Sequence, residues 1–288
     1  MIDPKRQNNA IIILAAGKGT RMKSAIPKIF HKIASHSMIE LVLMTIKKAK
    51  AKNIIIVVSD ETVNIKNIIK PSNNIKFVNQ KERLGTGHAV QLACKELPED
   101  IDIVSIIYAD TPFIKNTTIN NLEGLITQGN QAAVLGFEPI GDNAYGRLII
   151  SGNKLLEIVE YNEATSEQRK IKLCNSGIMS FDSTILRQYI SKIDNKNSKG
   201  EYYLTDLISL LTQDQHNVGN ITTDETEVMG INSISELIKA NKVQQKKLRD
   251  AAIEDSVNMI DPNTVYLAAD TKFGNGVTIE PNVYFGKD

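Results

Sequence analysis

The chain has 288 residues, 42% of them hydrophobic, and a formal net charge of +1. That length is enough for one large α/β domain with an appendage. A near-neutral charge gives no sign of a nucleic-acid partner, and no apolar run approaches the ~20 residues of a membrane span or forms a signal region. Two cysteines far apart in the sequence, Cys94 and Cys174, favour the cytoplasm over a disulfide or zinc site.

The first predicted element is a buried strand that ends in a glycine loop. An apolar run from Ile11 to Ala15 is followed by Gly17-Lys18-Gly19-Thr20, a pattern typical of a parallel strand and a tight turn. Backbone N–H groups of such a loop surround an anion without side chains in the way. The segment 5–39 has no Asp or Glu and carries these cations: Lys5, Arg6, Lys18, Arg21, Lys23, Lys28 and Lys32. The sequence therefore predicts a phosphate site here.

Strands and helices then alternate. Further strands are expected at 54–58, 75–78 and 103–108. One helix is expected at 37–50, and another is expected to open in the segment 80–88 and to run to residue 97. This order predicts βαβ units and a doubly wound, mostly parallel sheet. Ligands of such sheets gather at the carboxyl ends of the strands, where Gly17, Gln80 and Asp110 are expected.

The middle third predicts a second, smaller lobe. Short strands are expected at 132–137, 147–150 and 155–159, with a hairpin turn at Ser151-Gly152-Asn153. We expect a partly antiparallel lobe that covers the nucleotide pocket and holds the other substrate. Residues 175–178 return the chain to the main sheet, and residues 201–206 begin another helix.

The C-terminal part has a different sequence pattern from the rest of the chain. Ser233-Ile234-Ser235-Glu236 fits a capping box, which predicts a helix through Ala252. Beyond it, Leu267, Phe273, Ile279 and Phe285 recur every six residues, as in a hexapeptide β-helix; two amphipathic strands are the alternative. Because one coil cannot bury its own apolar face, we expect a shortened form of a longer protein. The predicted division is 1–231 for the main domain, 232–253 for a linker helix and 254–288 for the first coil.

The glycine loop differs from two familiar phosphate motifs. Lys18 precedes the second glycine, unlike a Walker loop, and Met22 replaces the third glycine of the dinucleotide fingerprint. L-A-A-G-K-G-T-R-M at 14–22, followed by Pro27-Lys28-Ile29-Phe30-His31, resembles the sugar-1-phosphate nucleotidyltransferases. The longer match is similar to the uridylyltransferase half of a bifunctional uridyltransferase and acetyltransferase family. This resemblance implies a Rossmann-like nucleotide-diphospho-sugar transferase fold and, beyond the chain, a left-handed β-helix.

The resemblance also implies a reaction. A phosphate oxygen of N-acetylglucosamine-1-phosphate attacks the α-phosphorus of UTP and expels pyrophosphate, with Mg²⁺ as cofactor. Arg21 is expected to hold the β- and γ-phosphates, and Lys28 the α-phosphate and the sugar phosphate; no acid lies near either in sequence. Asp110 and Asn232, the latter in Gly230-Ile231-Asn232, are the expected magnesium ligands, a sparse set of the kind Mg²⁺ accepts.

The remaining substrate contacts are carried over residue by residue. The nucleotide is expected against Leu14, Ala15, Ala16, Gly17, Gln80, Gly85 and Thr86, and the sugar or ribose against Gly146, Glu160 and Asn175. Tyr108 and Asn232 are expected as further substrate-binding residues. Ala109 stands where the family has glycine, which predicts less room for the substrate. The four histidines show no zinc spacing, and His88 is expected only to open a helix.

Two alternatives remain open at this point. One is a related enzyme that uses dTTP, ATP or GTP with another sugar phosphate; the other is a non-catalytic scaffold that binds nucleotide sugars. The resemblance implies a homotrimer for the longer family enzyme, whose trimer-forming part is absent here, so a monomer is compatible with this chain.

Overall fold

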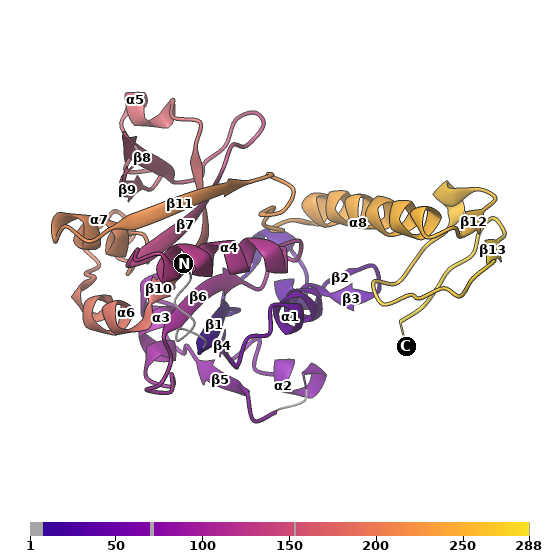
Figure 1. Cartoon of the computed structure of the whole chain (residues 1–288), viewed down its shortest axis with the longest axis horizontal. Helices are drawn as coiled ribbons and strands as arrows, with labels where there is room; N and C mark the ends of the chain where they lie inside the picture. The colour runs from indigo at the N-terminus through magenta and orange to yellow at the C-terminus, as the bar shows by residue number, and fades with distance from the viewer. Residues whose placement is uncertain (1–7, 70–71, 153, 288) are drawn as a thin grey trace.

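A computed structural model describes residues 8–69, 72–152 and 154–287. The predicted positions Lys5, Arg6 and Asn153 therefore lie outside the described residues. The core is a mixed sheet in the order β11-β7-β10-β6-β1-β4-β5, from which the β8–β9 hairpin extends (Figure 1). Its strands are β1 (Asn9–Leu14), β4 (Asn53–Val58), β5 (Ile75–Asn79), β6 (Ile103–Tyr108), β7 (Ala132–Phe137), β8 (Arg147–Ser151), β9 (Lys154–Val159), β10 (Cys174–Asp182) and β11 (Val218–Thr223).

Pairing along the main path of the sheet is parallel except at β10, and the β8–β9 hairpin beside it is antiparallel. β1 lies between β4 and β6 in parallel register, and β11 runs parallel to β7. β10 is antiparallel to both β6 and β7. The sequence prediction of a doubly wound, mostly parallel sheet is confirmed, with β10 as the reversed strand that joins its two halves.

Helices cover both faces of the sheet, and the alternation of side chains along the strands explains why. On β1, Ile12 joins a core cluster under α3, α6 and α7, whereas Ile11 and Ile13 join another under α1 and α4. Both sets are buried because successive residues of a strand point to opposite faces. The helices are α1 (Met38–Lys48), α2 (Ile65–Ile68), α3 (Thr86–Cys94), α4 (Asn116–Thr127), α5 (Ser166–Arg169), α6 (Ser183–Tyr189), α7 (Asp206–Gln213) and α8 (Ile234–Glu254).

The second lobe is smaller than predicted. β8 and β9 form the expected antiparallel hairpin, in which Leu148 faces Ile158. β7, which we expected beside them, instead lies in the main sheet between β10 and β11. Every residue of β7 is buried, because helices and neighbouring strands cover both of its faces. A short apolar run of this kind does not reveal which sheet it joins.

The long helix α8 extends from the main domain to the C-terminal coil (Figure 1). Ser233 caps it by accepting a hydrogen bond from the Glu236 N–H, while the Glu236 carboxylate accepts from the Asn232 N–H at 2.6 Å. The side chains of the six-residue repeat gather in one cluster beyond it. Tyr266 bridges Tyr284 in parallel, as one coil of three six-residue units requires. The continuation as a left-handed β-helix and the predicted domain division stay predictions.

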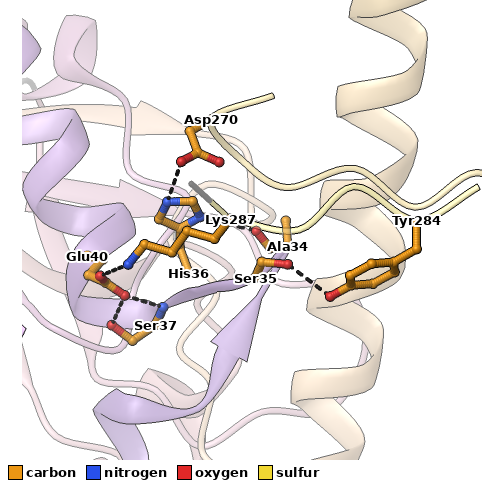
Figure 2. A network of polar contacts seen from close by, with 8 residues as sticks. All are labelled: Ala34, Ser35, His36, Ser37, Glu40, Asp270, Tyr284 and Lys287. Carbon is orange, nitrogen blue, oxygen red and sulfur yellow. Dashed lines mark hydrogen bonds and ion pairs between the residues drawn. The ribbon is translucent and has the colours of Figure 1, made fainter. Parts of the chain in front are cut away.

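The coil also touches the main domain through a short hairpin, β2 (Lys32–Ile33) and β3 (His36–Ser37). Figure 2 shows the contacts: Asp270 pairs with His36, Lys287 with Glu40, and the hydroxyls of Tyr284 and Ser35 hydrogen-bond. Within the described residues, the structure contains no helix with the length and apolar character of a membrane span.

Gln245 of α8 is expected to hold the coil in place. Its buried side chain donates to the Leu267 carbonyl at 2.6 Å and accepts from the Leu267 N–H at 2.9 Å. Gln245→Ala leaves both backbone groups unpaired, which is expected to cost about 2–4 kcal/mol. Hydrogen exchange of the Leu267 amide should accelerate accordingly. Gln244→Ala on the same helix, which removes no side-chain hydrogen bond to the described residues, is the control; equal exchange in both variants would contradict this role.

Candidate nucleotide-binding site

A cavity of about 510 Å³ opens at the carboxyl ends of β1, β4, β5 and β6. Leu14 and Tyr108 end their strands, and the Gln80 N–H donates to the Val58 carbonyl at 2.7 Å. The structure thereby brings together most of the residues predicted to meet the nucleotide. Those that line the cavity are Leu14, Ala15, Ala16, Gly17, Lys28, Gln80, Gly85, Thr86, Tyr108 and Asp110.

The glycine loop folds back so that Lys28 packs on it. Gly19 has φ +61°, a conformation that L-residues with side chains rarely adopt, and a Cβ there would lie 2.6 Å from the Lys28 Cβ. Glycine is therefore required at this position on both counts. Gly17 has no neighbour within 4 Å of the corresponding point, so its backbone faces open space in the cavity.

Lys28 forms the charged centre of the site. Its ammonium pairs with the Asp110 carboxylate and donates to the Asn232 side-chain oxygen at 3.0 Å. No acid lies near Lys28 in sequence, but in the structure Asp110 lies next to it despite a separation of 82 residues. Both side chains are largely buried, with exposed fractions of 11% and 17%, which strengthens the attraction.

Asp110 and Asn232 are held together by the backbone as well. The Ile231 N–H donates to the Asp110 carbonyl at 3.0 Å, so the end of β6 is tied to the segment that leads into α8. Two oxygens from distant parts of the chain thus converge on one cation. That donor set fits Mg²⁺, which accepts one or two protein oxygens together with phosphate and water. Among the described residues no group of three or more His, Cys, Asp or Glu side chains offers a fuller site.

The predicted sugar-side residues form a second group. The Asn175 N–H donates to the Gly146 carbonyl at 2.8 Å, and a Cβ on Gly146 would lie 3.6 Å from a Glu160 carboxylate oxygen. Tyr108 connects this group to the cavity. Burial, followed by the charges of Asp110 and Glu160, raises the pKa of its phenol, so the ring lies near carboxylates of both groups.

Arg21 stands apart from the cavity. It belongs to a 3₁₀ turn, Thr20–Met22, and its side chain is exposed and does not line the cavity. Burial and nearby carboxylates raise the pKa of the Tyr145 phenol, and the charge of Arg21 opposes that rise. The guanidinium therefore lies in electrostatic range of the loop that leads into β8.

Ala109 leaves the cavity unobstructed. Its methyl group is fully buried in the cluster formed with α1 and α4 and does not line the cavity. The expected loss of room is therefore wrong, because the alternation along β6 turns the side chain of Ala109 into the core.

Comparison with known proteins identifies the family. Residues 11–172, more than half of the chain, match the model of the MobA-like NTP transferase domain. The chain belongs to this family.

The chain also has relatives of greater length. It is 41% identical over 279 residues to the bifunctional protein GlmU of Paramagnetospirillum magneticum, a match that covers 96% of this chain and 62% of the relative. A bifunctional protein GlmU of Bradyrhizobium sp. is 40% identical over 281 residues, or 97% of this chain and 63% of the relative. The chain thus spans less than two thirds of the length of these relatives.

Solved structures share the fold. A putative glucose-1-phosphate thymidylyltransferase from Bacillus anthracis superposes with a TM-score of 0.67 at 20% identity, over 93% of this chain and 98% of that one. A UDP-glucose pyrophosphorylase gives 0.65 at 17% identity, over 84% of this chain and 100% of that one. At this identity the likeness concerns the fold of the chain alone.

The cavity also has lining residues that the sequence did not predict. Lys18, Ile29, Arg83, Ala89 and Glu201 line the cavity besides those predicted. Arg83 is paired with Glu61 at 3.0 Å. Lys18 lies in the glycine loop and Arg83 lies between the predicted Gln80 and Gly85, so their position in the sequence was the available signal. Nothing near Glu201 in sequence points to it.

Glu201 belongs to a segment, 201–206, that connects the two groups of site residues. Tyr202 accepts a hydrogen bond from the Gly87 N–H at 2.8 Å and donates to the Leu84 carbonyl at 2.7 Å. At the other end, the Thr205 hydroxyl donates to the Glu160 carboxylate at 3.1 Å. The loop at residues 84–87 and Glu160 are therefore positioned by one stretch of chain.

Asp206, at the end of this segment, makes stability depend on pH. Burial, followed by the charges of Glu160, Asp194 and Glu163, raises its pKa from 3.8 to about 6. Because the pKa is higher in the folded state, ionised Asp206 destabilises the fold above pH 6 and has no such effect below pH 4.

Asp206→Asn is therefore expected to raise the Tm at pH 8 by about 2–4 °C, corresponding to ~1 kcal/mol after allowance for solvent screening. The gain should disappear at pH 4. Melting of both proteins across this range checks the prediction, with Asp142→Asn, an exposed site, as control. A gain that is equal at both pH values would contradict it.

Proposed function

We propose that this chain catalyses Mg²⁺-dependent uridylyl transfer from UTP to N-acetylglucosamine-1-phosphate, giving UDP-N-acetylglucosamine and pyrophosphate. The observation that carries the proposal is the contact of Lys28 with Asp110 and Asn232 beside the glycine loop. A buried cation and two oxygen donors at the end of a nucleotide-sized cavity suit the joining of two phosphate esters. The sequence resemblance supports the choice of substrates.

The reaction needs alignment and charge neutralisation rather than a nucleophile from the protein, because the sugar phosphate itself attacks. Lys28 would neutralise the α-phosphate and the sugar phosphate, while Arg21 would hold the departing β- and γ-phosphates from its exposed turn. Bound Mg²⁺ would add neutralisation of the phosphate charge. Asp110 and Asn232 would hold the ion.

The two groups of residues would divide the substrates between them. Leu14, Ala15, Ala16 and Gly17 would meet the nucleotide through their backbone, and Gln80, Gly85 and Thr86 would meet the base. Gly146, Glu160 and Asn175 would hold the sugar. Tyr108 would lie between the two substrates, which agrees with its position between Asp110 and Glu160.

One assay tests the proposal: release of pyrophosphate from UTP, Mg²⁺ and N-acetylglucosamine-1-phosphate. Release that needs all three components supports it. If pyrophosphate is released with dTTP, ATP or GTP but not with UTP, the enzyme uses another nucleotide. If no triphosphate gives pyrophosphate, a non-catalytic scaffold is favoured. Buried, unpaired Cys94 and Cys174 suit the cytoplasmic location that we propose. A homotrimer is proposed only for the longer family enzyme.

A further inference from the structure

The side chain of Gln80 is held in one orientation. It is buried, with 4% of its surface exposed, yet it lines the nucleotide cavity. Its amide nitrogen lies 3.0 Å from the Gly85 carbonyl oxygen and 3.3 Å from Nδ1 of His88. A carbonyl oxygen only accepts hydrogen bonds, so the group that faces Gly85 is the NH₂.

This orientation also determines which ring nitrogen of His88 carries the hydrogen. With one amide hydrogen directed to Gly85, the other is directed to His88 Nδ1, which must accept and so carries no proton. The ring hydrogen of His88 is therefore on Nε2. Both N–H groups of Gln80 are satisfied by the protein, and Oε1 accepts no hydrogen bond from the described residues.

His88 reaches the ligand site only through Gln80. It lies in the first turn of α3 and does not line the nucleotide cavity. On its other side it lines a separate cavity together with Tyr202, whose ring centre is 6.4 Å away. The imidazole thus contacts Gln80 without lining the nucleotide cavity.

We propose that His88 is a positioning residue that makes Gln80 a pure hydrogen-bond acceptor toward the nucleobase. The inference rests on the proposed function. In a uracil nucleotide the only base donor is N3–H, which suits Oε1 of Gln80. Cytosine has an acceptor at N3, which would face Oε1 without a hydrogen between them. The pair therefore selects UTP over CTP, since a site that offers one kind of hydrogen-bonding group rejects a ligand that presents the same kind.

The test compares two substitutions of His88. His88→Leu removes one of the two acceptors that hold the NH₂ group of Gln80, so that the amide can turn and offer an N–H to a base acceptor. His88→Asn retains an acceptor close to the position of Nδ1. We expect wild type to prefer UTP to CTP in kcat/KM and in Kd from titration calorimetry. His88→Leu should lower the UTP/CTP ratio by about tenfold or more, and His88→Asn should keep it within about threefold.

Two further variants separate positioning from packing. His88→Gln, whose amide mimics the other ring nitrogen, should lose the ratio as His88→Leu does, which covers the case in which the leucine variant does not fold. Gln91→Leu on the same helix loses a hydrogen bond to the Ile190 carbonyl. It should lower the Tm without altering the ratio.

The outcomes distinguish this inference from the proposed function. If the wild type binds UTP in preference to CTP but does not turn it over, only the proposed function is overturned. The ratio of the two Kd values then still tests the role of His88. An unchanged ratio in His88→Leu and His88→Gln, or a wild type without preference for UTP, overturns the inference.

Discussion

Asp110→Ala is expected to lower kcat for pyrophosphate release by about 100- to 1,000-fold. The substitution removes the carboxylate that holds Lys28 and one of the two oxygens expected to bind Mg²⁺. Lys28 would keep only its contact with Asn232, so the position of its charge would no longer be defined. The loss should appear in kcat with both substrates saturating.

Asp110→Asn and Asp142→Ala are the controls for this variant. Asn keeps the volume but not the charge, and it should lose nearly as much activity if electrostatics carry the effect. Asp142 is exposed, and its alanine variant should be fully active. Asp142→Ala should melt within about 2–4 °C of wild type. The two Asp110 variants should melt lower but remain folded, because the largely buried Lys28 charge loses its partner. Retention of activity in Asp110→Ala would remove this residue from the site.

Gly85→Ala is expected to reduce kcat/KM for UTP by about 10- to 100-fold, because small displacements at a substrate site have effects of that order. Gly85 has φ +109°, and a Cβ there would lie 2.5 Å from the Tyr202 carbonyl oxygen and 2.9 Å from its nitrogen. Both are backbone atoms and cannot rotate aside. The loop would therefore lift from segment 201–206 and carry Thr86 and the Gly85 carbonyl away from Gln80.

The matched control is Gly129→Ala. Gly129 has φ +101°, close to that of Gly85, but nothing lies within 4 Å of the corresponding Cβ. It should show only the cost of the backbone conformation, about 1–2 kcal/mol, with normal kcat/KM. Urea unfolding should place Gly85→Ala below it by a further ~1–3 kcal/mol from the clash. Equal kinetics in the two variants would mean that the contact with Tyr202 has no part in nucleotide binding.

The main elements could be predicted from sequence because their signals are local. The apolar runs of β1, β4 and β6 and the stripe of α1 each reflect burial along a few consecutive turns or residues. The error at β7 has the same origin: its run identifies a buried strand but carries no information about its neighbours. Pairing with β10 and β11 depends on residues at least 37 positions away, as for Phe137 and Cys174.

The lining of the cavity was predictable for a related reason. Leu14 to Gly17 lie at the end of a strand and Gly85 to Thr86 at the start of a helix, and their glycines mark such places in the chain. Glu201, the pairing of Lys28 with Asp110 and the support of Gln80 by His88 had no comparable signal. Each depends on a side chain or segment that meets its partner only when the sheet is assembled.

Local sequence signals were sufficient to place most strands and helices and the glycine loop at residues 17–20. Long-range packing was needed to show that Lys28 is paired, that Ala109 points into the core and that segment 201–206 connects both groups of site residues. The two kinds of information differ in the distance along the chain over which they act. Propensity and periodicity act over a few residues, whereas contacts such as that of Lys28 with Asn232, 204 residues apart, exist only after long-range packing has brought their backbones together.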